Sequence, residues 1–114
     1  VYDIIRVRKL DGEPVVIEYT KMPIQLIPGI KKSVLETSIY AYIEKKLKFK
    51  IQSAHRTVKA DMPTAEEKKA LQIEGILPIL EVEQVAFLDD GLPFEYSVSR
   101  HRGDRNVFRS VSIR

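Results

Sequence analysis

Apolar and polar residues alternate near the start of the chain with the two-residue period of β-strands. Residues 1–10 and 15–20 are rich in β-branched side chains, which favour strands. The dipeptide Asp11-Gly12 between them is typical of a tight hairpin turn. We therefore expect an antiparallel strand pair, followed over residues 21–32 by a loop or short irregular helix, where two prolines break the pattern.

An amphipathic helix is predicted next, because apolar residues recur every four positions. The recurring residues are Leu35, Ile39, Ile43 and Leu47. Three starting points stay open for this helix. Ser33 has Glu36 at capping-box spacing, whereas Thr37 and Ser38 are also good N-cap residues.

A second helix is predicted to begin directly after Pro63. Thr64 suits the N-cap position, and Glu67, three residues later, closes a capping box. We expect this helix to end near Glu74-Gly75, where the glycine is a typical stop signal.

Four further strands are predicted in the second half of the chain, over residues 49–61, 76–88, 92–99 and 106–113. Asp89-Asp90-Gly91 supplies the turn between the second and third of these. Since hairpins dominate the order of elements, the sequence predicts an α+β fold with a mostly antiparallel six-stranded sheet and helices packed on it.

The composition is that of one globular domain. The 114 residues are 44% hydrophobic and 31% charged, and their apolar runs are too short to span a bilayer. The absence of cysteine excludes disulfides, cysteine zinc sites and a thiol nucleophile, and it fits a cytoplasmic protein. The formal net charge is +3. The 19 basic residues do not gather in a nucleic-acid-binding arm, because the 16 acidic residues are interspersed with them.

Known catalytic and cofactor motifs are missing from the sequence. It contains no phosphate-cradling glycine loop and no nucleophile elbow, and its two histidines, His55 and His101, are far apart. We therefore expect no catalytic residue, no metal and no cofactor.

The strand pattern begins at the first residues of the chain. Charged residues such as Asp3 and Arg6 lie within it, which argues against a signal peptide. We expect the chain to have been cut at a domain boundary.

Two arginines on the first predicted strand are candidates for binding an anion. Arg6 and Arg8 are two positions apart, so their side chains leave the same face. Two adjacent guanidinium groups repel unless an anion joins them, and their forked donors match phosphate or carboxylate. A solvated strand face or ion pairs with glutamates explain the same pair of arginines. Ser38 would add a hydroxyl and free backbone N–H groups at a helix start, or serve only as an N-cap.

The face on which Glu18 lies depends on the hairpin register. A plain two-residue turn at Asp11-Gly12 pairs Arg6 with Ile17 and sends Glu18 to the opposite face from the arginines. An odd-numbered loop or a bulge, which Pro14 would encourage, brings Glu18 to the arginine face.

Glu95 is a candidate on a later strand. If its neighbours Phe94 and Tyr96 face the core, Glu95 faces the other side with Ser97, as a surface carboxylate. Tyr40 suits the core or its rim. The segment from Arg102 to Arg105 predicts a turn with an Asp–Arg ion pair.

A set of short motifs, in order along essentially the whole chain, resembles the UTRA domain of the HutC-type branch of GntR regulators. They are Arg6-Val7-Arg8, Asp11-Gly12-Glu13-Pro14, Glu18-Tyr19, Thr37-Ser38-Ile39-Tyr40, Leu71, Gly91-Leu92-Pro93-Phe94-Glu95 and Arg102-Gly103-Asp104-Arg105-Asn106-Val107-Phe108. The resemblance implies a chorismate lyase-like fold and a cytoplasmic homodimer with a DNA-binding winged-helix domain upstream. It also implies a small anionic effector, often a sugar phosphate, whose binding changes the affinity for DNA.

The resemblance also assigns roles to individual residues. The phosphate would meet Arg6, Arg8, Ser38 and Tyr40. The carboxylates of Glu18 and Glu95 would bind sugar hydroxyls. His101 stands where the family often has tyrosine, and Arg102 lies in the motif near the pocket, so both join the expected effector-binding residues.

The sequence is compatible with two other functions. The chorismate lyase-like fold also permits an enzyme that holds a small carboxylate with Arg6, Arg8 and Glu18; formation of product from chorismate would decide for it. A direct nucleic-acid binder is disfavoured because no predicted helix carries a recognition pattern; a salt-sensitive shift of DNA by this chain alone would revive it.

Overall fold

The computed structural model describes residues 1–35 and 38–113 of the chain. Its strands are β1 (Tyr2–Leu10), β2 (Glu13–Met22), β3 (Ile51–Asp61), β4 (Ile79–Leu88) and β5 (Pro93–Arg102). Its helices are α1 (Lys32–Leu35), α2 (Ile39–Lys45) and α3 (Ala65–Ala70).

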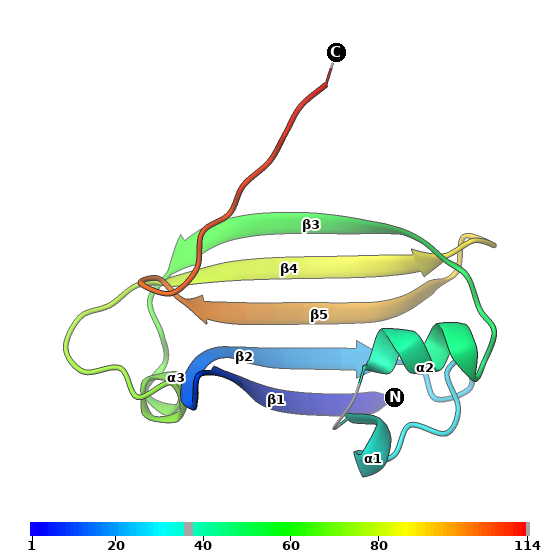
Figure 1. The fold of residues 1–114 in the computed structure, drawn as a ribbon, viewed down its shortest axis with the longest axis horizontal. Helices are drawn as coiled ribbons and strands as arrows, with labels where there is room; N and C mark the ends of the chain where they lie inside the picture. The colour runs from blue at the N-terminus through cyan, green and yellow to red at the C-terminus, as the bar shows by residue number, and fades with distance from the viewer. Residues whose placement is uncertain (36–37, 114) are drawn as a thin grey trace.

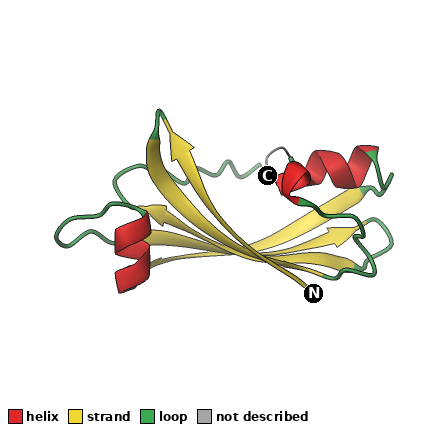
Figure 2. Cartoon of the chain, turned by 90° about the horizontal axis from the view of Figure 1, so that it is seen from below, coloured by secondary structure: helices red, strands yellow, loops and turns green. Residues whose placement is uncertain are grey.

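The strands form one antiparallel sheet in the order β1-β2-β5-β4-β3 (Figure 1). Helices α2 and α3 lie at opposite ends of the sheet and on opposite faces (Figure 2). Each covers its own apolar cluster. Ile39 and Ile43 of α2 pack with Phe94 and neighbouring residues, whereas Leu71, just after α3, packs with Ile17 and other residues of the second cluster. The α+β class predicted from the sequence is confirmed.

The described residues form five strands, so the prediction of a six-stranded sheet is wrong. Residues 106–113 are extended but pair with no described strand, and Figure 1 shows them projecting away from the sheet. Val111 and Ile113 are 86% and 92% exposed. The physical reason is the position of β5. Strand β5 lies between β2 and β4, so no free sheet edge is next to it. The residues that follow β5 therefore have no neighbouring strand edge with which to pair.

The first predicted helix is shorter than its apolar repeat suggested. Ser38 is the N-cap of α2, and its side-chain oxygen accepts a hydrogen bond of 3.2 Å from the backbone N–H of Ala41. Leu35 belongs to the separate α1, and Leu47 follows the end of α2. The alternative starts at Thr37 and at the Ser33–Glu36 box involve residues 36 and 37, which lie outside the described residues.

The second predicted helix starts as expected and ends early. Thr64 caps α3, and both hydrogen bonds of the capping box with Glu67 are present, which confirms that prediction. The helix ends at Ala70 rather than near Glu74-Gly75. Gln72, directly after the C-cap Leu71, adopts a positive φ of 54°, and this left-handed residue ends the helix before Gly75.

The hairpin between β1 and β2 contains the bulge on which the face of Glu18 depends. Asp11 and Gly12 both have positive φ, as a two-residue type I′ turn requires. Lys9 pairs with Pro14, but Arg8 pairs with Val16, so Val15 is the extra residue of β2. The bulge therefore sets Glu18 opposite Arg6, on the same face.

A buried charge network holds α3 on its face of the sheet. Arg100 of β5 is 8% exposed, and its Nε lies 2.9 Å from the carboxylate of Glu67. Arg100 also pairs with Glu81 and with Asp61, and Tyr19 donates a hydrogen bond of 2.8 Å to Glu67. One guanidinium thus pairs with three carboxylates, and Lys59 adds a second cation at Glu81, so every buried charge has a partner of opposite sign.

The network also shifts the pKa values of its members. Burial and the hydrogen bond to Glu67 raise the pKa of Tyr19 to about 12. Burial opposes the ionised form of Glu67, but the hydrogen bonds from Thr64 and Tyr19 and the charge of Arg100 outweigh it, so its pKa is lowered. Glu67 is therefore ionised at neutral pH beside the Arg100 guanidinium.

Replacing Arg100 with methionine is expected to lower the free energy of unfolding by about 3–5 kcal/mol, because it leaves Glu67 charged and buried without its cation. Lys59→Met is the matched control. Lys59 pairs with the same Glu81 but is 60% exposed, so its loss is expected to cost at most about 1 kcal/mol. Urea unfolding at neutral pH measures both variants. Equal losses would contradict the role given to burial.

Candidate functional site

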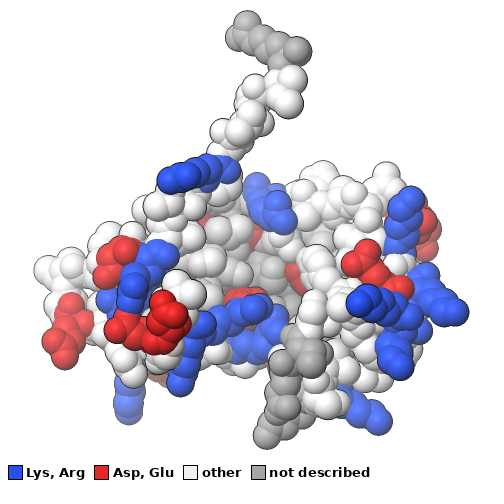
Figure 3. Space-filling model, viewed as in Figure 1, with Lys and Arg blue, Asp and Glu red and all other residues white. Residues whose placement is uncertain are grey.

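A cavity of about 400 Å³ lies between the sheet and the start of α2. All five strands contribute to its lining, together with the first residues of α2 and its N-cap. Figure 3 shows this face, hollowed near its middle, with basic and acidic side chains at the hollow. Among the described lining residues, three arginines (Arg6, Arg8 and Arg56) stand against two glutamates (Glu18 and Glu95).

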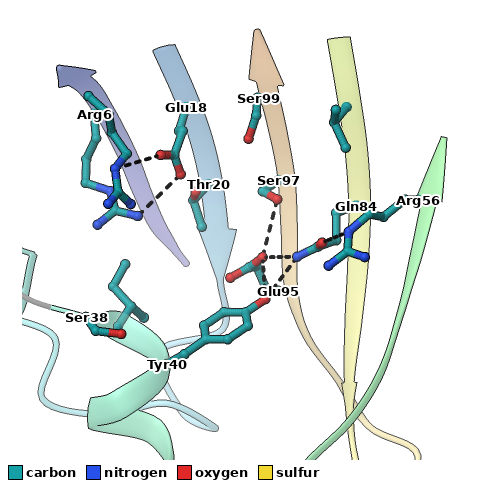
Figure 4. Close-up of a pocket in the computed structure, with 13 residues that line it drawn as sticks. Arg6, Glu18, Thr20, Ser38, Tyr40, Arg56, Gln84, Glu95, Ser97 and Ser99 are labelled. Carbon is teal, nitrogen blue, oxygen red and sulfur yellow. Dashed lines mark hydrogen bonds and ion pairs between the residues drawn. The ribbon is translucent and has the colours of Figure 1, made fainter. Parts of the chain in front are cut away.

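One end of the cavity is formed by Arg6 and Glu18 (Figure 4), together with Arg8, which pairs with the same glutamate. Arg6 Nη2 lies 3.4 Å from Glu18 Oε2, and Arg8 Nε lies 3.5 Å from Glu18 Oε1. Arg6 Nη1 donates a hydrogen bond of 3.4 Å to the carbonyl of Leu35. One carboxylate thus lies between two guanidinium groups, and this end keeps a formal positive charge.

The Nε of Arg6 is buried and has no hydrogen-bond partner among the described residues. A buried N–H without an acceptor costs about 1–3 kcal/mol relative to a satisfied one. The contacts of Arg6 with Glu18 and Leu35 are also long for hydrogen bonds. An oxyanion such as phosphate would satisfy this donor once the Arg6 side chain turned toward it, because the atom has almost no exposed surface in this structure.

The middle of the cavity is organised by Glu95, which is only 8% exposed. Its Oε1 accepts hydrogen bonds from Tyr40 Oη (3.1 Å), Gln84 Nε2 (2.9 Å) and Ser97 Oγ (3.3 Å). None of the described hydrogen bonds uses Oε2. Since a carboxylate oxygen is an acceptor, Oε2 is free to receive the proton of a ligand hydroxyl.

Tyr40 is fixed in place by the same group of residues. Its hydroxyl donates to Glu95 and accepts a hydrogen bond of 2.9 Å from Gln84 Nε2. Its ring packs edge-on against the ring of Phe94, with 5.8 Å between the ring centroids. Burial and the neighbouring Glu95 charge raise the pKa of Tyr40. The tyrosine therefore stays protonated and acts as a hydrogen-bond donor, not as a base.

Six of the eight residues expected to bind the effector line this cavity. They are Arg6, Arg8, Glu18, Ser38, Tyr40 and Glu95. The alternative that made Glu95 a surface carboxylate is wrong, because α2 and its tyrosine cover that side chain.

His101 and Arg102 do not line the cavity. His101 follows Ser99 on the cavity face of β5, where burial lowers its pKa and the charge of Glu18 opposes that shift. Arg102 points to the other face. It pairs with Asp104 at 3.0 Å and donates to the carbonyl of Leu71, which confirms the predicted ion pair in this turn.

Several lining residues were missed in the sequence. Thr20, Ser97 and Ser99 follow from strand alternation once the faces of Glu18 and Glu95 are known. Arg56 and Gln84 carry no such signal, because they meet only through the register between β3 and β4.

Two negative findings concern the described part of the chain. It contains no cluster of three or more histidine, cysteine, aspartate or glutamate residues able to hold a metal ion. Among the same residues, no helix is long and apolar enough to cross a membrane.

Comparison with known proteins places the fold and the site in a family. The family model of the UTRA domain matches residues 1–106. The transcriptional regulator GmuR of Bacillus subtilis is 49% identical over all 114 residues, and TreR of the same species is 34% identical over 113 residues. The chain spans only about half the length of these relatives, 48% and 47% respectively.

Solved structures agree with the sequence relatives. A GntR-family regulator from Bacillus cereus is 41% identical and superposes with a TM-score of 0.87. The effector-binding domain of the B. subtilis trehalose repressor TreR is 34% identical with the same TM-score. Each alignment covers 98% of this chain and 78% of the other.

The fold and its relatives define a regulatory, ligand-sensing domain. The chain belongs to the UTRA domain family of GntR-type transcriptional regulators.

The side chain of His101 is expected to titrate below the usual histidine pKa of 6.5, because it is half-buried. Glu18→Gln should lower this pKa further, since the Glu18 charge favours the protonated imidazole. NMR titration of the two histidines measures this shift, with His55→Gln to assign the signals. A His101 pKa that rises or does not move in Glu18→Gln would place Glu18 on the other face of the hairpin.

Proposed function

We propose that this domain binds a small anionic metabolite, a phosphorylated sugar, in the cavity and thereby modulates DNA binding by a winged-helix domain upstream. The observation that carries the proposal is the unsatisfied, buried Nε of Arg6 beside Arg8 at one end of a polar cavity. A guanidinium donor left without an acceptor favours a ligand that brings a negative charge.

The phosphate of this effector would lie between Arg6, Arg8 and Ser38. The Ser38 oxygen accepts from Ala41, which leaves its own proton free to donate to a phosphate oxygen. The sugar ring would lie further along the cavity, with a hydroxyl donating to Glu95 Oε2. Tyr40 and Glu18 would border the ring, whereas His101 and Arg102 would stay outside contact distance.

The names of relatives support a sugar-derived effector. Besides the trehalose repressor, a repressor of the mannosyl-D-glycerate transport and metabolism system from Escherichia coli is 34% identical over 114 residues. Several relatives are named as HTH-type regulators, and the chain matches about half of their length. Both facts support a DNA-binding domain in the remainder of the full protein.

The signal would be carried by a shift between two arrangements of the protein. Residues 23–31 connect β2 to α1, and Arg6 contacts the carbonyl of Leu35 in α1. A phosphate at Arg6 would change these contacts and so favour one position of α1 relative to the sheet. An effector shifts such an equilibrium only by its difference in affinity for the two states. No substrate turnover is part of this mechanism.

We also propose that the cytoplasmic, full-length regulator is a homodimer. The exposed apolar side chains of residues 106–113 support it, because Val107, Val111 and Ile113 lie in water in the single chain at 73–92% exposure. Light scattering that found a monomer at high protein concentration would reject this part of the proposal.

A thermal-shift titration tests effector binding. Phosphorylated sugars are expected to raise the unfolding midpoint, with a stabilisation of about 2.7 kcal/mol at a hundredfold excess over Kd. The same sugars without phosphate should give little shift. Arg6→Ala should abolish the response, whereas Lys59→Ala, which removes an exposed cation on β3, should keep it.

Two results would contradict the proposal. One is a folded domain that responds to no phosphorylated sugar and to no small dicarboxylate. The other is an equal response in Arg6→Ala and in the unchanged protein.

A further inference from the structure

The cavity has a second cationic end, formed by Arg56 of β3, whose contacts differ from those of Arg6 and Arg8 (Figure 4). We propose that Arg56, held by Gln84, is a specificity-determining subsite that selects phosphorylated disaccharides over phosphorylated monosaccharides. This inference rests on the proposed function, since it assumes that the phosphate binds at the Arg6 end.

The guanidinium group of Arg56 has no anionic partner in the described part of the chain. Its Nε donates a short hydrogen bond of 2.6 Å to Gln84 Oε1, and none of the described hydrogen bonds or ion pairs uses its two terminal nitrogens. By contrast, Arg6 and Arg8 both pair with Glu18. Arg56 therefore offers the cavity a set of N–H donors that no described side chain occupies.

Gln84 fixes the direction of these donors. Its Nε2 donates to Glu95 Oε1 and to Tyr40 Oη, both at 2.9 Å, so its Oε1 must face Arg56. A flipped amide would set its N–H₂ group against the Nε–H of Arg56 and leave two donors facing each other. The chain of contacts from Tyr40 and Glu95 through Gln84 thus orients Arg56 as part of the site, although Arg56 is exposed.

The two cationic ends lie on opposite edges of the sheet. Arg6 lies on β1 and Arg56 on β3, the opposite edges of the sheet, with four strand spacings between them. At about 4.8 Å per spacing, their backbones lie roughly 19 Å apart across the sheet, and the side chains close only part of that gap. Glu95, on the central strand β5, lies between them.

This order of donors and acceptors describes an extended ligand. An anion at Arg6 and a hydroxyl donor at Glu95 Oε2 account for one phosphorylated sugar unit. The donors of Arg56 are then available to acceptor oxygens beyond that unit, which a second sugar unit supplies through its ring and hydroxyl oxygens. Because Arg56 is exposed and water screens its charge, neutral oxygens suffice and a second acid is not needed.

Calorimetric titration of the domain with matched ligands tests the subsite. The probes are the 6-phosphates of glucose and mannose, the 6-phosphates of disaccharides built from these two sugars, and the same disaccharides without phosphate. The protein is expected to bind at least one disaccharide phosphate about tenfold or more tightly than the matching monosaccharide phosphate. Arg56→Met should weaken that disaccharide phosphate about tenfold and change the monosaccharide phosphate less than about twofold.

Matched variants separate this inference from the function on which it rests. Arg6→Met should weaken both ligand classes, and Lys59→Met, on the same strand as Arg56, should weaken neither. Urea unfolding checks that Arg56→Met is folded, as expected for an exposed residue on an edge strand.

Distinct results would overturn the subsite and the proposed function. Equal weakening of both ligand classes by Arg56→Met, or no weakening of either, would reject the subsite while leaving the phosphate site intact. The ligand could instead carry an acid in place of the second sugar unit. Tighter binding of a phosphorylated glycosyl acid than of every disaccharide phosphate would show that Arg56 binds a second anion, and would reject the disaccharide. If the unchanged protein bound no phosphorylated ligand more tightly than its unphosphorylated counterpart, both proposals would be rejected.

Discussion

One extra residue in the second strand determines the chemistry of the site. Without the bulge at Val15, the two-residue turn at Asp11-Gly12 would pair Arg6 with Ile17 and send Glu18 to the opposite face. With it, Arg6, Arg8 and Glu18 share one face. The same shift places Ile17 on the other face, in the apolar cluster beside α3. The cavity and one apolar cluster thus depend on a single register.

The cavity exists because α2 covers only part of its face of the sheet. Seven helical residues extend about 10 Å, whereas a ten-residue strand such as β5 extends about 33 Å. The apolar cluster beneath α2 fills one end of that face, and the uncovered part is lined by polar side chains. On the opposite face, the Arg100 network stabilises the packing of α3 through ion pairs in which one guanidinium serves three carboxylates. The charges of one face are therefore satisfied within the protein, whereas the cavity keeps free donors and acceptors for a ligand.

The sequence predicted most of the fold and one end of the site, because those features depend on local signals. The turn at Asp11-Gly12 and the capping box of α3 follow from a few adjacent residues. Strand alternation put Arg6 and Arg8 on one face, but only the resemblance to a family joined Tyr40 and Glu95 to them. The sixth strand and the Arg56–Gln84 contact were not predictable in this way, since each depends on which strands become neighbours in the sheet. Long-range register is the part of the structure that local pattern leaves open.

We propose the Arg6 end of the cavity as the place where an anionic effector binds. A crystal structure of the domain with a bound phosphorylated sugar would show where the anion lies. We expect a phosphate oxygen within hydrogen-bond distance of Arg6 Nε, the donor that has no partner among the described residues. A phosphate bound elsewhere on the domain, with Arg6 Nε still unpaired, would contradict it.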